Sequence, residues 1–348
     1  MSTDTTVYAQ LPSVDVHAHV LVPDVERAVA DQPGLSAQRD LDLRRNGAES
    51  TAVSAVMVQE RGSLLVRTDH RLELMDQQGV DVQVLSPSPS QYHYWADESL
   101  ALDLARYVND GVAYAVGAAP ARLTGLGLVP LQHPNLAAAA LHDAVDKGLR
   151  GVEISSHAPD PRGGTIELSD PRLEEFWSEA AALGVVVFVH PFGCTLDERL
   201  DRWYLSNSVG QPVETAVALS HLIFAGVLDR HPSLQVLAAH GGGYLPTYLG
   251  RSDRAWHVRS EAKTCAKPPS AYLRQLWFDS VVHDERALRT LVDTVGAEQV
   301  CLGSDHPFDM GSDDPIGDLE ASGLTAYEIN AIKRGNAHRL GLRAGLGS

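Results

Sequence analysis

The sequence predicts an α/β fold, a single (β/α)8 barrel of the TIM type with one large insertion after its first strand. Short apolar runs alternate with helix-like segments along most of the 348 residues, and polar residues that can bind a metal close several of those runs. Parallel strands that close into such a barrel present their carboxyl ends at one face, where active sites lie. The length would also fit two average domains, but one barrel accounts for all of it.

The eight strands that such a barrel needs can be placed in order. They are residues 14–19, 80–86, 123–129, 149–155, 185–190, 234–240, 276–281 and 300–305. Periodicity and capping signals predict helices between them, at residues 69–78, 97–115, 135–147, 170–183, 212–230 and 284–295. Glycines stand just past the ends of four of these helices, at Gly79, Gly148, Gly184 and Gly296, as is typical where a helix ends before the next strand.

We expect one domain over residues 1–348. The alternation of strands and helices is interrupted at residues 23–68, about forty-five residues rich in Arg, Asp and Gly. Loops between a strand and the next helix usually contain only a few residues. A long insertion at the catalytic face predicts a lid or small subdomain. A shorter insertion follows residue 190.

The first strand ends in His17-Ala18-His19. Residues two apart in a strand share a face, so both imidazoles converge, and a divalent metal is the usual shared partner of buried histidines. Two structurally satisfied histidines are the alternative. Three further strands end in His190, His240 and Asp305, and histidines with a carboxylate suit Zn²⁺ while also accepting Fe²⁺, Co²⁺ or Mn²⁺.

Composition excludes several classes of protein. A formal charge of -17 without a basic stripe predicts no nucleic-acid partner and no binding to anionic membranes. No apolar stretch approaches the ~20 residues of a membrane span, and the start lacks the features of a signal peptide, so we expect a cytoplasmic protein. The three cysteines, an odd number, suggest neither a disulfide framework nor a cysteine metal site.

Several motifs together resemble the amidohydrolase superfamily, in the branch typified by aminocarboxymuconate-semialdehyde decarboxylase. They are residues 14–19 (VDVHAH), 75–83, His190-Pro191, the segment 237–256 with its His-Gly-Gly-Gly and Leu-Gly-Arg motifs, 303–308 (GSDHPF) and 335–337. The resemblance covers nearly the whole chain.

The resemblance implies that His17, His19, His190 and Asp305 bind the metal, and that His240 is the acid/base beside it, with Asp305 also catalytic. Binuclear members of the superfamily bridge two metals with a carboxylated lysine on the fourth strand. The four lysines here, Lys147, Lys263, Lys267 and Lys333, lie outside the predicted strands. A single metal ion is therefore expected, with Zn²⁺ the first choice and one per subunit.

Substrate-binding residues follow from the same resemblance. Arg251 matches a family arginine that reaches a neighbouring subunit's site, which implies a homodimer. Arg61 in the insertion is the expected second carboxylate clamp, because the planar guanidinium binds two oxygens at once. Arg44, Arg45 and Arg67 are its alternatives, and a solvated surface charge is the simpler reading of each. Trp203 and Phe308 match aromatic residues of the family pocket, and Glu153 is a candidate to orient a metal-bound histidine.

The sequence thus predicts a mononuclear, metal-dependent, non-oxidative decarboxylase of an aromatic or muconate-semialdehyde-type carboxylic acid. A hydrolase or cyclase that acts on an amide, ester, lactone or C–C bond with the same metal is the alternative, because a barrel alone does not decide the reaction. A metal-binding protein without activity would require the open coordination position to be blocked.

Overall fold

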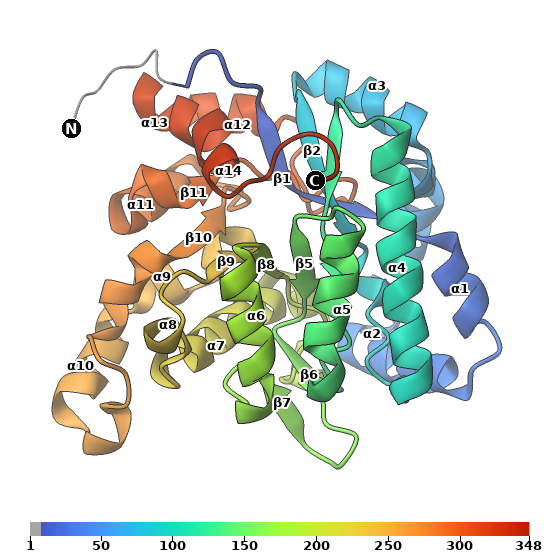
Figure 1. The fold of residues 1–348 in the computed structure, drawn as a ribbon, viewed down its shortest axis with the longest axis horizontal. Coiled ribbons are helices and arrows are strands. Elements are labelled where there is room, and N and C mark those ends of the chain that lie inside the picture. Colours follow the sequence, from blue (N-terminus) through green and yellow to red (C-terminus); the bar gives the residue numbers. More distant parts are fainter. Residues whose placement is uncertain (1–7, 348) are drawn as a thin grey trace.

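A computed structural model describes residues 8–347 of the chain. Residues 1–7 and 348 of the expected domain lie outside the described part. Strands alternate with helices along the sequence, and the helices pack outside a central parallel sheet (Figure 1).

Each predicted strand overlaps a strand of the structure, β1 and β2 each run one residue beyond the predicted end, and the third is divided in two. They are β1 (Val14–Val20), β2 (Val82–Pro87), β3 (Leu123–Gly125), β4 (Gly127–Leu128), β5 (Gly151–Ile154), β8 (Val186–Val189), β9 (Gln235–Ala238), β10 (Leu276–Asp279) and β11 (Val300–Cys301). The neighbours run β1-β2-β3 and β4-β5-β8-β9-β10-β11, all in parallel.

Backbone contacts between the first and last strands close the ring. The Val16 amide donates to the Leu302 carbonyl, and the Asp305 amide donates to the His17 carbonyl, each at 2.8 Å. Ala18 forms a parallel bridge with His306 just beyond β11. The closure confirms the predicted barrel and brings the segment around Asp305 beside His17.

The predicted helices are present, with two differences. They are α3 (Thr68–Gln78), α4 (Glu98–Ala118), α5 (Pro134–Asp146), α6 (Glu174–Leu183), α7 (Gln211–Phe224), α8 (Val227–Arg230) and α11 (Glu285–Val295). The helix expected at 212–230 is divided because Gly226 adopts a left-handed conformation with φ of 68°. The helix expected from residue 170 begins as a 3-10 turn, Pro171–Leu173, before α6.

Further elements decorate the barrel. They are α9 (Leu245–Tyr248), α10 (Gly250–Val258), α12 (Pro315–Ala321), α13 (Ala326–Asn330), α14 (Asn336–Arg339) and the antiparallel hairpin of β6 (His157–Pro159) with β7 (Thr165–Glu167). Helix α10 projects from one corner of the molecule (Figure 1). Within residues 8–347, none of the helices combines the length and hydropathy needed to span a bilayer.

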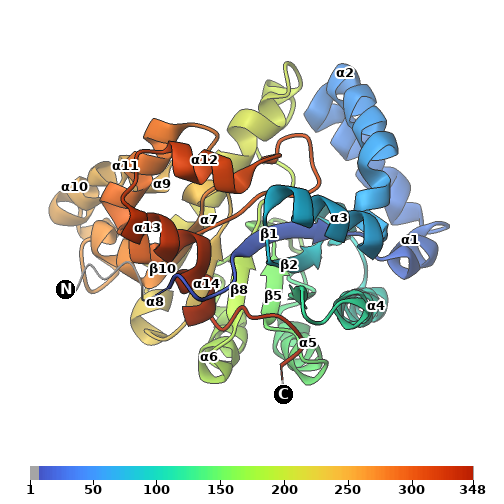
Figure 2. The same cartoon turned by 90° about the horizontal axis from the view of Figure 1, so that it is seen from above.

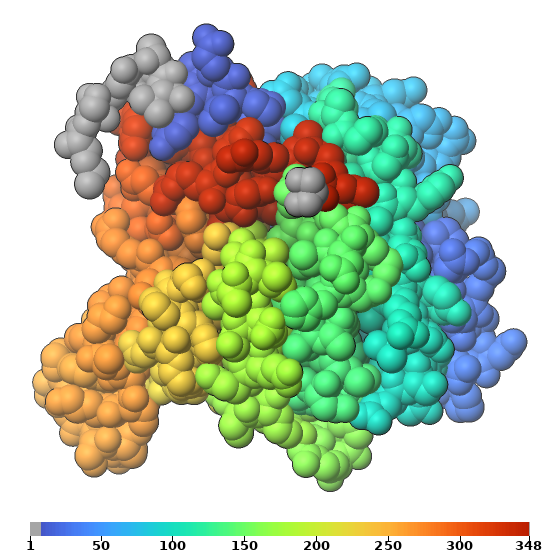
Figure 3. All heavy atoms as spheres, in the orientation of Figure 1, coloured from blue at the N-terminus to red at the C-terminus, as the bar shows by residue number. Residues whose placement is uncertain are grey.

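The end of the barrel opposite the metal ligands is covered by the C-terminal segment. Figure 3 shows this segment lying across one face of the molecule. The Gly345 amide donates to the Leu123 carbonyl and the Gly347 amide to that of Gly148, so the segment is tied to residues at the start of two strands. This leaves the carboxyl ends of the strands for the functional site.

The expected insertion folds as two helices, α1 (Pro23–Val29) and α2 (Pro33–Val66). Helix α2 bends at Gly47, where φ is 76°, and a Cβ there would lie 1.9 Å from the Asp201 carbonyl oxygen. Glycine therefore permits a close approach of α2 to the second insertion. Seen from above, α2 stands beside that loop at the rim of the barrel (Figure 2).

Candidate metal centre and active site

Four histidines and one aspartate gather where the strands end. His17 and His19 lie in β1, His190 follows β8, His240 follows β9 and Asp305 lies beyond β11. The rings of His17 and His190, and of His190 and His240, have centroids 5.0 Å apart. His17 and His19 are fully buried, and His190 and Asp305 nearly so.

Asp305 faces different histidines with its two oxygens. Its Oδ1 lies 3.3 Å from His17 Nε2 and 3.2 Å from His19 Nε2, and these two nitrogens are 3.1 Å apart. Its Oδ2 lies 3.4 Å from His240 Nε2. One carboxylate thus separates a buried pair of imidazoles from a more accessible one.

The donor set fits a divalent metal ion. Ligand atoms of His17, His190, His240 and Asp305 all lie within 4.8 Å of one another. Both ring nitrogens of His190 are buried without a hydrogen-bond partner among residues 8–347, as a ligand nitrogen would be. This group of four contains His240 where the sequence predicts His19, although His19 Nε2 touches both His17 and Asp305.

Hydrogen bonds on the far side of two rings fix their orientation. His17 Nδ1 lies 2.6 Å from Asp279 Oδ2, and His19 Nδ1 lies 3.2 Å from the Pro87 carbonyl. A proton on each Nδ1 leaves Nε2 with a free lone pair toward the cluster. This is the usual arrangement of metal-binding histidines.

Sequence reasoning missed Asp279, which organises both sides of the site. Its Oδ2 also accepts the His240 amide at 2.9 Å, while Oδ1 accepts the amides of Gly241 and Val281. The side chain is fully buried. A carboxylate directly after the apolar residues Leu276-Trp277-Phe278 was the available signal, because an aspartate is rarely buried without a partner.

Other buried side chains support His19. Glu153 Oε2 lies 3.8 Å from His19 Nδ1, and its Oε1 accepts the Tyr92 hydroxyl at 2.6 Å. The buried Arg71, also missed, donates to the His19 carbonyl and to Gln83. Glu153 thus stands where it could orient a ligand, and that role is a prediction.

Burial and neighbouring charges shift the pKa values of two histidines of the cluster in opposite directions. Burial alone would lower the pKa of His17, but the carboxylates of Asp305 and Asp279 raise it to about 10. Burial, reinforced by the neighbouring His19 and His17, holds the pKa of His190 well below its usual range. The pKa of Asp305 is also well below its usual range because His17 outweighs the effect of burial. The cluster therefore keeps an anionic carboxylate beside neutral His190, and a bound metal ion would displace the extra proton from His17.

A cavity of about 410 Å³ adjoins this cluster and is lined by His240, Asp305, His283 and Met310, among others. His240 and Asp305 both have positive φ, 54° and 59°. Strain of this kind in non-glycine residues persists where the surrounding structure demands it, commonly at functional sites. The cavity therefore gives a small molecule access to the two residues expected to be catalytic.

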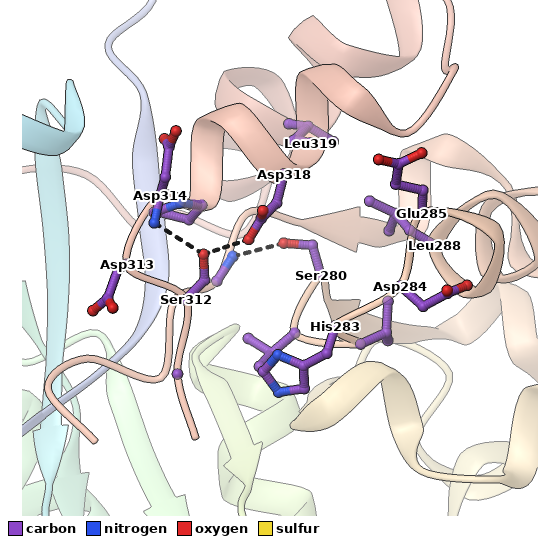
Figure 4. A pocket seen from close by; sticks show the side chains of 15 residues that line it. Ser280, His283, Asp284, Glu285, Leu288, Ser312, Asp313, Asp314, Asp318 and Leu319 are labelled. Carbon is purple, nitrogen blue, oxygen red and sulfur yellow. Dashed lines mark hydrogen bonds between the residues drawn. The ribbon is translucent and has the colours of Figure 1, made fainter. Parts of the chain in front are cut away.

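A neighbouring hollow of about 450 Å³ has a different character (Figure 4). It shares His283 with the cavity above but is rimmed by exposed acidic side chains: Asp284, Glu285, Asp313, Asp314 and Asp318. Ser312 Oγ bonds to Asp318 and to the Asp314 amide within it. Because none of the clustered histidines lines this hollow, the candidate active site is the smaller cavity beside them.

The expected substrate residues divide into two groups. The Phe308 ring centroid lies 5.2 Å from that of His19, and Arg61 donates to the Pro307 carbonyl at 3.2 Å while facing Asp313. Trp203 is 79% exposed, and Arg251 lies exposed on α10. The structure brings Phe308 and Arg61 next to the cluster or its loop, whereas Trp203 and Arg251 are exposed and are not among the residues that line the 410 Å³ cavity.

The alternative arginines also have partners. Arg44 and Arg45 both face Asp197 in the second insertion, at 3.0 and 3.8 Å, and Arg67 pairs with Asp69 on the surface. Arg61 is therefore the arginine of the insertion that contacts the loop following Asp305.

Comparison with known proteins agrees with this geometry. The profile of a family described as Amidohydrolase matches residues 14–340. A 2-amino-3-carboxymuconate-6-semialdehyde decarboxylase of Dictyostelium discoideum is 34% identical over 86% of this chain and 82% of its own length. A gamma-resorcylate decarboxylase of Polaromonas is 29% identical over 80% of this chain and 89% of its own.

Solved structures show the same fold. The 5-carboxyvanillate decarboxylase of Sphingomonas paucimobilis superposes with a TM-score of 0.80 and 26% identity, over 95% of this chain and 99% of that one. The match over nearly the whole of both chains agrees with a barrel whose insertions belong to the same fold.

Proposed function

The chain belongs to the amidohydrolase family, and we propose that it is a mononuclear, metal-dependent, non-oxidative decarboxylase of an aromatic or muconate-semialdehyde-type carboxylic acid. The relatives that span most of its length and are named for an activity of this kind support the reaction class. We further propose one Zn²⁺ per subunit, a homodimer and a cytoplasmic location.

The observation that carries this proposal is that the two oxygens of Asp305 face different histidines. Its Oδ1 faces the buried nitrogens of His17 and His19, whereas its Oδ2 faces His240 on the wall of the 410 Å³ cavity. We assign His17, His19, His190 and Asp305 as the residues that hold the metal. His240, the most accessible of the four histidines, is the acid/base.

A metal ion held by these residues would supply a Lewis acid for substrate oxygens beside the carboxylate to be lost. His240 donates a proton to the carbon that bears this carboxylate, where a positioned imidazole is an effective general acid near neutral pH. The C–C bond then breaks, its electron pair stays with the carbon skeleton, and CO₂ leaves. Asp305, 3.4 Å from His240 Nε2, orients the ring beside the cavity.

Substrate binding is assigned to four residues. Arg61 and Phe308 come from the loop and insertion beside the ligands, and Arg61 has a partner, Asp313, that a carboxylate could replace. Arg251 and Trp203 are exposed in one chain, so we propose that they complete the site across a dimer interface, with Arg251 reaching the partner's cavity.

The test is CO₂ release by metal-loaded protein given freshly generated aminocarboxymuconate semialdehyde or, in parallel, 2,6-dihydroxybenzoate. We expect stoichiometric CO₂ that stops after chelation and returns when Zn²⁺ is restored. Metal content measured on the same sample identifies the ion. With the metal confirmed and no CO₂ from either acid class, the same site would instead serve hydrolysis or cyclisation of esters, amides or lactones.

A further inference from the structure

A second cavity, of about 250 Å³, lies between α2 and the loops that follow β2, β5 and β8. Its walls are largely aromatic, with Tyr92, Tyr94, Trp95 and Phe192 among the lining residues. The rings of Tyr92 and Tyr94 stack at 5.3 Å with an interplanar angle of 17°. Flat walls in a space below the roughly 300–1,000 Å³ of drug-sized sites suit a small planar molecule.

Hydrogen-bonding groups line this cavity without protein partners. Arg45 Nε, His93 Nε2, Trp95 Nε1 and Ser155 Oγ are all buried and lack a partner among residues 8–347. The arginine and indole nitrogens can only donate, and the other two atoms can donate as well. Arg45 Nε and Trp95 Nε1 therefore each need an acceptor that the described residues do not supply.

The charge of the cavity points to an anion. Its fifteen described lining residues include Arg45 but no Asp or Glu, in a protein whose formal charge is -17. Arg45 is only loosely engaged, because Asp197 lies 3.8 Å from its Nε and 3.0 Å from Arg44 Nη2. A guanidinium with spare donors beside aromatic walls is suited to an aromatic carboxylate.

The backbone of His93 adds an independent sign. Its φ is 43°, and the side chain is 7% exposed. His240 and Asp305, the residues assigned to catalysis, share this left-handed conformation. Strained non-glycine residues cluster at ligand-binding positions, where the fold holds a side chain in place against its preference.

We propose that this cavity is a second binding site, distinct from the metal centre, for a small planar aromatic carboxylate held by Arg45, His93, Trp95 and Ser155. The metal ligands do not line it. Tyr92 forms a shared wall, because its hydroxyl bonds to Glu153 and lies 3.3 Å from the His190 carbonyl. The proposal stands on the cavity itself and does not depend on the reaction assigned above.

The test uses 4-bromobenzoate as the probe on metal-loaded protein. Crystals soaked with it should show an anomalous bromine peak in the cavity, with the carboxylate within hydrogen-bond distance of Arg45. Calorimetric titration should then resolve this site in solution, and Arg45→Met should weaken binding there by about tenfold or more, as loss of a charged hydrogen-bond donor does.

Arg44→Met is the matched control, because Arg44 is adjacent on the same helix, faces the same aspartate and does not line the cavity. Trp95→Phe keeps the aromatic wall, removes only the donor and should also weaken binding, which covers the case of an unstable Arg45 variant. The proposal fails if bromine appears only at the metal centre, if the cavity holds water alone, if binding occurs only in the crystal, or if Arg44→Met and Arg45→Met bind equally.

Discussion

The two sides of the active-site cavity are built differently. The metal side consists of buried side chains at strand ends, and two of them, His17 and His19, are held by Asp279 and the Pro87 carbonyl. The substrate side draws on α2, the loop after β8 and α10, where Trp203 and Arg251 are exposed. The barrel thus fixes the positions of the clustered residues, whereas the residues proposed to bind substrate lie on the insertions and on a surface helix.

Asp305→Asn should have the largest effect, because it removes the one carboxylate that faces His17, His19 and His240 together. We expect loss of the bound metal and turnover at background level, checked by metal analysis and CO₂ release. Asp309→Asn, an exposed neighbour in the same loop, is the control. A variant that keeps one equivalent of metal would show that Asp305 is not a ligand.

His240→Asn separates chemistry from metal binding. We expect one retained equivalent of metal and turnover lower by about 10²–10⁴-fold, the contribution of a positioned general acid. Metal analysis and single-turnover CO₂ release on the same sample test this. If the metal is lost as well, His240 belongs to the ligand set, as the group within 4.8 Å would suggest.

Arg251→Met tests whether the exposed Arg251 binds substrate in a neighbouring subunit. If the arginine clamps a carboxylate in the partner's cavity, its loss removes about 2–5 kcal/mol of charged hydrogen bonding, which raises KM by roughly thirtyfold or more. Arg254→Met, exposed on the same helix, should leave KM unchanged. Mixing Arg251→Met with His240→Asn subunits should restore one working site per mixed dimer. Full activity in a monomer by sedimentation would contradict the shared site.

Asp279→Asn should affect both His17 and His240, because the Asp279 carboxylate contacts both residues. The amide can no longer accept at every position that the carboxylate serves, including His17 Nδ1 and the amides of His240 and Gly241. We expect metal affinity to fall by roughly 10–100-fold, as for other residues that orient a ligand. Competition with a chelator measures it. Excess metal should then rescue part of the turnover, whereas unchanged affinity would make Asp279 merely structural.

The sequence was most informative where burial forces a pattern. Apolar runs that end in His190, His240 and Asp305 predicted both the barrel and the cluster, because strand ends of a closed barrel meet. The role of Asp279 was not predicted, because a single aspartate at the end of a strand does not reveal its partners. Those partners lie in β1 and after β9.

The insertion was harder to predict. Among the residues of α2 only Ser50 and Leu65 are buried, so the helix has little apolar periodicity to recognise. Trp203 and Arg251 are exposed, and composition and spacing do not encode where an exposed side chain lies relative to the site.

The smallest expected effect concerns acid stability and the loop after β2 that carries His93, which we call the mouth loop. Burial lowers the pKa of His93 from 6.5 to about 4. Between pH 6.5 and about pH 4, His93 is protonated in the unfolded chain but neutral in the folded one. The free energy of unfolding therefore decreases as the pH is lowered through this range. At pH 5 the loss is about 2 kcal/mol. His93→Gln should flatten this part of the pH profile of unfolding in urea, whereas His257→Gln, exposed on α10, should not. Equal slopes in both variants would mean that His93 is charged in the folded protein, and that the mouth loop is as open to solvent as α10.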